Sequence, residues 1–183
     1  PLVEEVEGAA VPVDDLQRER GLTYLQQTQA KDGSWEQLVG YKLNSDYETV
    51  DSRPLPHVGV TALAGIAFLA GGHLPDRGKY GKVVSGALRF VLDQENRGGQ
   101  HPGYLHNPQA TPHGPMYGHG FATLYLAEVY GMSPRQDVGE KLHNAIRLIV
   151  NCQQPNVGGW RYQPTPTDSD ISVTICQIMA LRA

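Results

Sequence analysis

Two aspartates near the C-terminus carry the clearest chemical signal in this sequence. Asp168 and Asp170 stand in the stretch GGWRYQPTPTDSDISVTICQIMALRA, where a glycine-aromatic turn leads into an apolar segment with almost no other charge. A carboxyl group beside a second carboxyl group can be tuned to donate a proton as a general acid. An aspartate is also a favoured helix N-cap, because its charge complements the helix dipole. The two residues alone leave both roles open.

The elements that must position these aspartates are predicted to be helices arranged in three pairs. Each pair joins an amphipathic outer helix to an inner helix that is apolar nearly all round and therefore buried. No alternating strand pattern of any length is present, so the fold class is all-α. The outer helices are expected at about 14–30, 82–94 and 138–154, and the inner helices at 57–72, 116–132 and 169–183.

The inner helices align on a threonine, and a polar residue precedes each threonine by four positions. The pairs are His57 with Thr61, His119 with Thr123, and Asp170 with Thr174. Stacked helix hairpins bury their faces against neighbouring hairpins. We therefore expect the three polar side chains to gather around a common mouth, beside long connections at about 31–56 and 97–115 that are typical of functional loops.

Length and composition place the chain among single-domain proteins. Its 183 residues suffice for one domain with a real core, here 14–183, preceded by an N-terminal extension at 1–13. The net charge of -4 and the lack of a basic run exclude nucleic acid as an expected partner. No secretory signal and no membrane span of roughly 20 apolar residues is visible.

A motif of glutamine, glycine and tryptophan recurs between the outer and inner helices. One copy holds Gln29 and Gly33-Ser34-Trp35, and another holds Gln153 and Gly158-Gly159-Trp160. A glutamine at the end of a helix can satisfy unpaired backbone groups, and a tryptophan packs over it where glycine permits a tight turn. We therefore assign Gln29, Trp35, Gln153 and Trp160 to the fold. The middle unit keeps Gln94 but lacks the tryptophan.

This motif resembles the QW repeat of squalene–hopene cyclase and oxidosqualene cyclase, which are α/α-toroid terpene cyclases. The resemblance runs from about residue 20 to the C-terminus and implies three hairpins of a partial toroid, with a domain that is expected to be incomplete at its C-terminus. In that family an Asp-x-Asp-Asp-Thr motif follows a Gly-Gly-Trp turn, and its middle aspartate protonates the substrate. The resemblance implies Asp170 as general acid and Asp168 as its partner, although Ile171 replaces the third aspartate.

Four further residues are candidates to line a substrate cavity. Tyr117 and Phe121 follow the spacing of one helix face and can offer aromatic ring faces to an isoprenoid cation, while His57 and His119 share the register of Asp170. Core packing is the alternative for the aromatic pair. We expect no cofactor and no metal, because the spacing of His101, His106, His113 and His119 fits no single helix face.

Two functions remain open at this level. The first is a cyclase-like isomerase that binds or cyclises a polyprenyl or triterpene substrate. The second is a non-catalytic module or scaffold that binds a lipid or protein partner. Half a ring exposes apolar edges, so a homodimer that closes the half-toroid is an expected partner state. A cytoplasmic or peripheral membrane location follows from the resemblance.

Overall fold

Six helices make up most of the described chain, which confirms the all-α prediction. The computed structural model describes residues 15–38, 40–43, 46–49, 53–110 and 114–183, so the predicted extension at 1–13 lies outside it. Each predicted helix is present, with its ends shifted by at most a few residues. The helices are α1 (Asp15–Thr28), α2 (Val58–Ala70), α3 (Gly81–Asp93), α4 (Pro115–Met132), α5 (Gln136–Asn151) and α6 (Ile171–Arg182).

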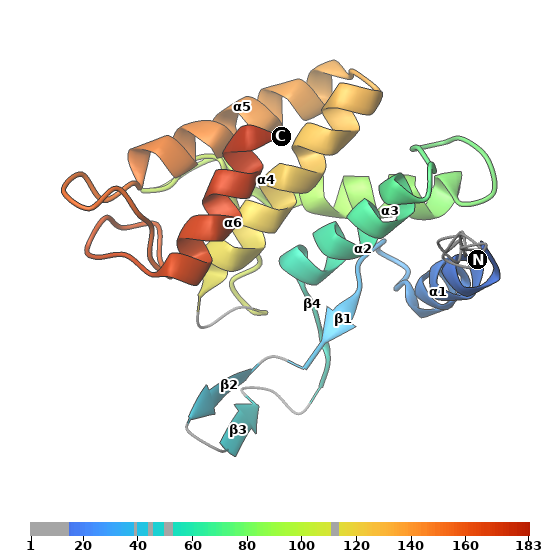
Figure 1. Cartoon of the computed structure of the whole chain (residues 1–183), viewed down its shortest axis with the longest axis horizontal. Helices are drawn as coiled ribbons and strands as arrows, with labels where there is room; N and C mark the ends of the chain where they lie inside the picture. The colour runs from blue at the N-terminus through green and yellow to red at the C-terminus, as the bar shows by residue number, and fades with distance from the viewer. Residues whose placement is uncertain (1–14, 39, 44–45, 50–52, 111–113) are drawn as a thin grey trace, which may run out of the picture.

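The helices form two layers (Figure 1). The inner layer runs α2, α4, α6, with each helix packed on the next, while α3 packs on α2 and α5 packs on α4. The outer helix of each pair therefore leans on the inner helix of the preceding pair, and α1 contacts α2 at the other end of the array. Closure of such an array into a toroid stays a prediction.

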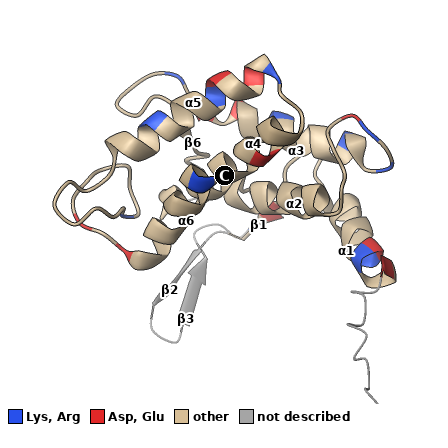
Figure 2. Cartoon of the chain, turned by 45° about the horizontal axis from the view of Figure 1, so that its top comes forward, with Lys and Arg blue, Asp and Glu red and all other residues tan. Residues whose placement is uncertain are grey.

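Helices α2 and α4 are largely buried because their sequences are apolar nearly all round, whereas α6 buries one face and exposes the other. In Figure 2, α2, α4 and α6 carry few charged residues, and most of the charge lies on the outer helices and the connections. Close approach between inner helices depends on glycine at the contact. A Cβ added to Gly65 of α2 would lie 2.5 Å from the Tyr125 ring of α4, so only a glycine admits that ring. Tyr125 itself is fully buried. None of the described helices combines the length and apolarity needed to cross a bilayer.

The ends of the inner helices follow local sequence signals. His57 and Asp170 are the N-caps of α2 and α6, and each side chain accepts a hydrogen bond from a backbone amide of the first turn. Helix α4 begins differently, with Pro115 in the first turn after Gly114, whose φ is 67°. Its start at Pro115, close to the predicted 116, lies eight residues before Thr123, whereas α2 and α6 each begin three residues before their threonines.

Three short antiparallel ribbons were not predicted. They pair β1 (Glu36–Gln37) with β4 (Leu55–Pro56), β2 (Gly40–Leu43) with β3 (Asp46–Thr49), and β5 (Glu95–Asn96) with β6 (Tyr104–Leu105). Strands of two to four residues are too short to show an alternating pattern in the sequence. The first ribbon ties together the two ends of the connection between α1 and α2, and the third closes the first part of the connection between α3 and α4.

Candidate functional site

The first glutamine–tryptophan turn connects three helices. The Gln29 side-chain amide donates to the carbonyl oxygens of Gly33 (3.0 Å) and of Val83 in α3 (2.9 Å). The Trp35 indole N–H donates to the Leu25 carbonyl of α1 at 3.0 Å. Since the Trp35 backbone N–H also donates to Thr61 Oγ1 of α2 at 3.0 Å, the turn fixes α1, α2 and α3 relative to one another.

The third unit reproduces this geometry next to the aspartates. The Trp160 indole donates to the Ile149 carbonyl at 2.7 Å, and its backbone N–H donates to Thr174 Oγ1 at 3.1 Å. The Asp170 backbone N–H donates to the Trp160 carbonyl (2.8 Å), as that of His57 does to the Trp35 carbonyl (3.1 Å). The alignment of Thr61 with Thr174 therefore has a physical basis. Each threonine hydroxyl accepts a hydrogen bond from the backbone N–H of the tryptophan in its turn.

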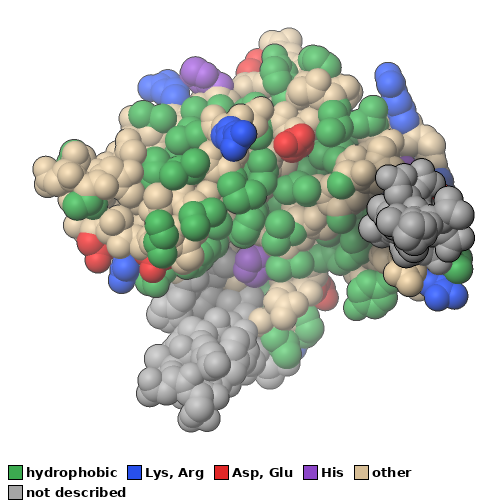
Figure 3. All heavy atoms as spheres, in the orientation of Figure 1, with side chains coloured by type: hydrophobic (Ala, Val, Ile, Leu, Met, Phe, Trp, Pro, Cys, Tyr) green, Lys and Arg blue, Asp and Glu red, His purple; other side chains and the backbone are tan. Residues whose placement is uncertain are grey.

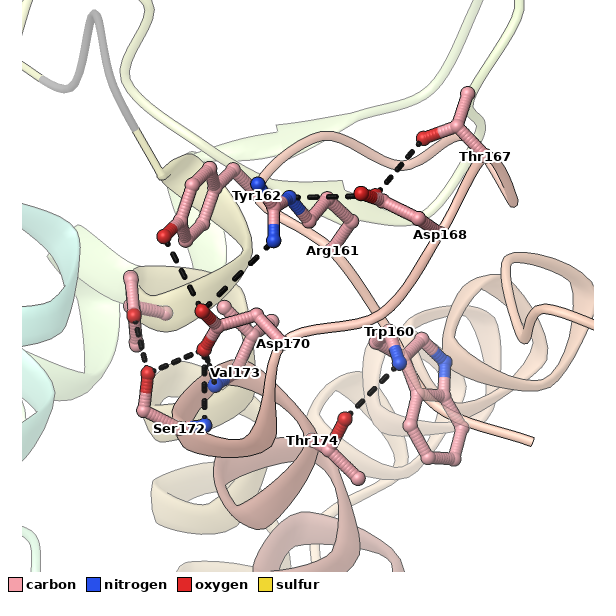
Figure 4. A network of polar contacts seen from close by, with 10 residues as sticks. Trp160, Arg161, Tyr162, Thr167, Asp168, Asp170, Ser172, Val173 and Thr174 are labelled. Carbon is pink, nitrogen blue, oxygen red and sulfur yellow. Dashed lines mark hydrogen bonds and ion pairs between the residues drawn. The ribbon is translucent and has the colours of Figure 1, made fainter. Parts of the chain in front are cut away.

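The same turn places Asp170 at the start of α6 (Figure 4). Asp170 Oδ1 accepts hydrogen bonds from the backbone N–H groups of Ser172 (2.9 Å) and Val173 (3.2 Å), and from the Ser172 hydroxyl. Asp170 Oδ2 accepts a hydrogen bond from the Tyr162 hydroxyl at 3.2 Å. These donors stabilise the charged carboxylate, so the pKa of Asp170 is lowered, with the Ser172 hydroxyl as the largest cause.

Arg161 lies between the two aspartates. Its guanidinium is 3.2 Å from Asp168 Oδ1 and 3.9 Å from Asp170 Oδ2, and it lies over the Tyr162 ring at 4.4 Å. A shared arginine offsets the repulsion between carboxylates that would otherwise raise a carboxyl pKa. The contacts of Asp170 favour an anion over a proton donor at this position. We did not predict Arg161 or Tyr162 as site residues, although a cation beside two aspartates in sequence was an available signal.

The expected cavity residues reach this network unequally. The Tyr117 hydroxyl of α4 hydrogen-bonds the Ser172 hydroxyl of α6, which links it to Asp170. Phe121 is partly buried and packs against the main core. His57 caps α2, where its Nδ1 accepts from the Val60 amide at 3.3 Å, and burial lowers the pKa of its imidazole.

His119 lies in the core. Its side chain is fully buried, Nδ1 accepts from the Leu105 amide at 3.2 Å, and the other ring nitrogen lies 3.3 Å from the Ala145 carbonyl. Burial lowers the pKa of His119 to about 4. His119 therefore does not face solvent as a residue at an open mouth would, because α4 begins eight residues before Thr123 and carries His119 inside.

A hollow of about 780 Å³ lies along the outer helix α5, where we expected no site. Glu95 stands in its wall, with its carboxylate bonded to Asn144 (2.9 Å) and Arg97 (3.2 Å) and lying 3.9 Å from Lys141. The lining residues come from α5 and from the connections before α4 and after α5, and include none of the expected cavity residues.

Metal binding has no support in the described residues, where no three His, Cys, Asp or Glu side chains converge. Of the four histidines considered for a metal, His113 lies outside the described residues. Comparison of the chain with protein-family models, with curated proteins and with solved structures finds no match.

Proposed function

We propose that this domain is a non-catalytic α/α-repeat module that binds an apolar ligand of the isoprenoid class on the face of its inner helices. The proposal rests mainly on the state of Asp170, which its hydrogen bonds hold as an anion. An aspartate with an ordinary pKa near 3.9 is protonated in only about one molecule in a thousand at pH 7. A lowered pKa makes that fraction smaller still, which opposes protonation of an alkene.

The inner helices offer an apolar surface for such a ligand. Tyr117, Phe121 and Leu124 follow one another along α4 and are each partly exposed. Ile66 of α2 and Met179 of α6 each stand five residues after the threonine of their helix, where α4 carries Glu128. Figure 3 shows hydrophobic side chains gathered over these inner helices on the face turned to the viewer. Aromatic and aliphatic side chains with few charges suit an isoprenoid chain.

Proton-initiated cyclisation is the second candidate. It is supported by the place of Asp168 and Asp170, which follow a Gly-Gly-Trp turn and open an inner helix as in the cyclases that the sequence resembles. Its requirement is a protonated Asp170 facing an apolar cavity. Release of the carboxyl from Ser172 and Arg161 would have to accompany substrate binding.

Native mass spectrometry of the chain with squalene and with polyprenyl alcohols tests both candidates. We expect one isoprenoid to be retained, no cyclised product after incubation, and unchanged retention in Asp170→Asn. Phe121→Ala is expected to weaken retention about tenfold, the effect of removing one buried aromatic contact. Val150→Ala, a matched change of an exposed apolar residue on α5, is the control and leaves retention unchanged.

Two results contradict the proposal in different ways. A cyclised product that disappears in Asp170→Asn establishes the second candidate. Failure of the wild-type chain to retain any isoprenoid, in a folded state verified by circular dichroism, rules out both.

A further inference from the structure

Three glycines with positive φ mark the turns between outer and inner helices, and two of them touch the next outer helix. A Cβ on Gly33 (φ +92°) would lie 2.2 Å from the Gly86 carbonyl oxygen of α3. A Cβ on Gly103 (φ +87°) would lie 2.4 Å from the Asn144 carbonyl oxygen of α5. Gly158 (φ +75°) has only the Gln153 amide at 4.0 Å, so the corresponding face of the third turn is open.

The glutamine of the third turn, Gln153, also makes no contact with a following outer helix among the described residues. Gln29 binds the carbonyl of its own turn at Gly33 and the Val83 carbonyl of the following outer helix. Gln153 makes the first of these contacts, with Gly158 at 2.7 Å, and among the described residues no outer helix supplies the second. The third turn is therefore built like the first and lacks the helix that the first one receives.

One face of α6 is exposed where the equivalent faces of α2 and α4 meet the next inner helix. Counted from the threonines, Gly65 of α2, which touches Tyr125 of α4, corresponds to Ile178 of α6. Gly120 of α4, against Cys176 of α6, corresponds to Ile171. Three isoleucines line this face of α6, with exposed fractions of 76% for Ile171, 50% for Ile175 and 51% for Ile178.

The opposite end of the array carries the complementary features. Gly21 of α1 precedes Gln29 by as many residues as Gly86 precedes Gln94, and nothing lies within 4 Å of a Cβ built on it. A glycine here permits the backbone contact that Gly86 makes with the first turn. On α2, Leu63 stands at the position of Tyr125 in α4 and is 45% exposed.

We propose that a second copy of this chain docks head to tail on the open end. In this arrangement α1 of the second copy lies on the turn at Gly158, and its α2 lies on the isoleucine face of α6. The interface continues the one already formed between successive hairpins, so it needs no new type of contact. Such a contact is heterologous, and two copies form a closed pair when the rotation between them is a half turn. This inference does not depend on the proposed ligand.

Sedimentation velocity of the 183-residue chain and of single-site variants tests the proposal. We expect the wild type to reach twice the 20.0 kDa mass of one chain with rising concentration. Ile175→Lys places a charge on the exposed face of α6, and Gly21→Lys places one on α1 at the opposite end of the array. Each should weaken association at least about tenfold by burying an uncompensated charge. Val150→Lys, an exposed position on α5, is the matched control and should associate like the wild type.

Mixing the two blocked variants gives the decisive result. Each keeps one intact end, so the mixture should recover a dimer that neither variant forms alone, which also shows that both variants are folded. A wild-type chain that stays monomeric at every concentration overturns the proposal. So does Gly21→Lys that dimerises like the wild type, because this outcome means that α6 pairs with α6 of the other copy. A mixture that stays monomeric has the same consequence.

Discussion

At the scale of single residues, the two aspartates belong to a network that stabilises negative charge. Asp170 receives two backbone amides and two hydroxyl groups, and Arg161 lies close to both carboxylates. Each of these contacts is stronger with an ionised carboxylate than with a carboxylic acid. Asp170, which the sequence resemblance suggests as a general acid, is the N-cap of α6 in the structure. It also accepts a hydrogen bond from Tyr162 in the preceding loop.

Asp170 should therefore stabilise the fold in a pH-dependent manner. Its folded-state pKa is lowered, so its contribution is present above the unfolded pKa near 3.9 and is lost as the pH falls through the lower folded value. Asp170→Ala should cost about 1 kcal/mol at pH 7, whereas Asp170→Asn, also a good cap, should cost less. Urea denaturation of both variants at pH 7 and pH 3 measures this, and an equal cost at both pH values would contradict the assignment.

His119 gives a second pH dependence, in a higher range. Its pKa is about 4 in the folded state because of burial, against about 6.5 for an exposed histidine, so only the unfolded chain gains this proton between those values. Stability should fall by about 1.4 kcal/mol per unit as the pH drops from 6.5 to 4. His119→Gln, which keeps a donor and an acceptor, should flatten this slope in urea titrations, while His143→Gln on the exposed side of α5 should not.

At the scale of elements, the first two turns are each completed by the outer helix that follows them. The first turn rests on α3 through Gln29 and Gly33, and the second rests on α5 through Gly103 and Glu95. The turns therefore act as joints between hairpins as well as links within them. Their glycines carry two separate requirements, a positive φ and space for the neighbouring backbone.

Substituting these glycines separates the two requirements. Gly33→Ala adds a clash with the Gly86 carbonyl to the strain of a positive φ, so it should cost well above 2 kcal/mol or prevent folding. Gly158→Ala meets only the strain, about 1–2 kcal/mol in the monomer. Urea midpoints at low protein concentration, where only monomer is present, provide the comparison. Equal losses in the two variants would mean that the contact with α3 contributes nothing.

The sequence predicts the helices well because periodicity and caps are local properties. The apolar spacing and Gly71, which follows Ala70, locate α2, and the polar residue before Ile171 locates the start of α6. The burial of His119 could not be obtained in this way, since aligning the threonines does not show that His119 lies within α4 whereas His57 and Asp170 are N-caps. The charge state of Asp170 depends on the Ser172 hydroxyl and on two backbone amides, whose placement only the folded turn determines.

At the scale of the whole molecule, the array is asymmetric. Its two ends present different and complementary surfaces, with an open glycine and a leucine on α1 and α2, and an open turn and isoleucines on α6. Single exposed apolar side chains are common on protein surfaces, but a continuous face on one helix indicates contact with a partner. The proposed pairing buries this face in the same type of contact that joins α2 to α4 and α4 to α6.

This pairing makes stability depend on concentration. If folded chains associate, the unfolding temperature should rise with protein concentration, because dilution favours the separated state. Scanning calorimetry of the wild type over a hundredfold concentration range should show the rise, and Ile175→Lys should abolish it. A wild-type midpoint that does not move with concentration would count against association of the folded chain.

The contact from Gln29 to Val83 also has a consequence for synthesis on the ribosome. The first turn finds its second partner in a helix that is translated more than 50 residues later, as the sequence separation of 54 shows. Domains begin to fold while the chain is still emerging, at roughly 5–20 residues per second. The first hairpin must therefore wait several seconds, until α3 has left the exit tunnel, before its turn is locked in place.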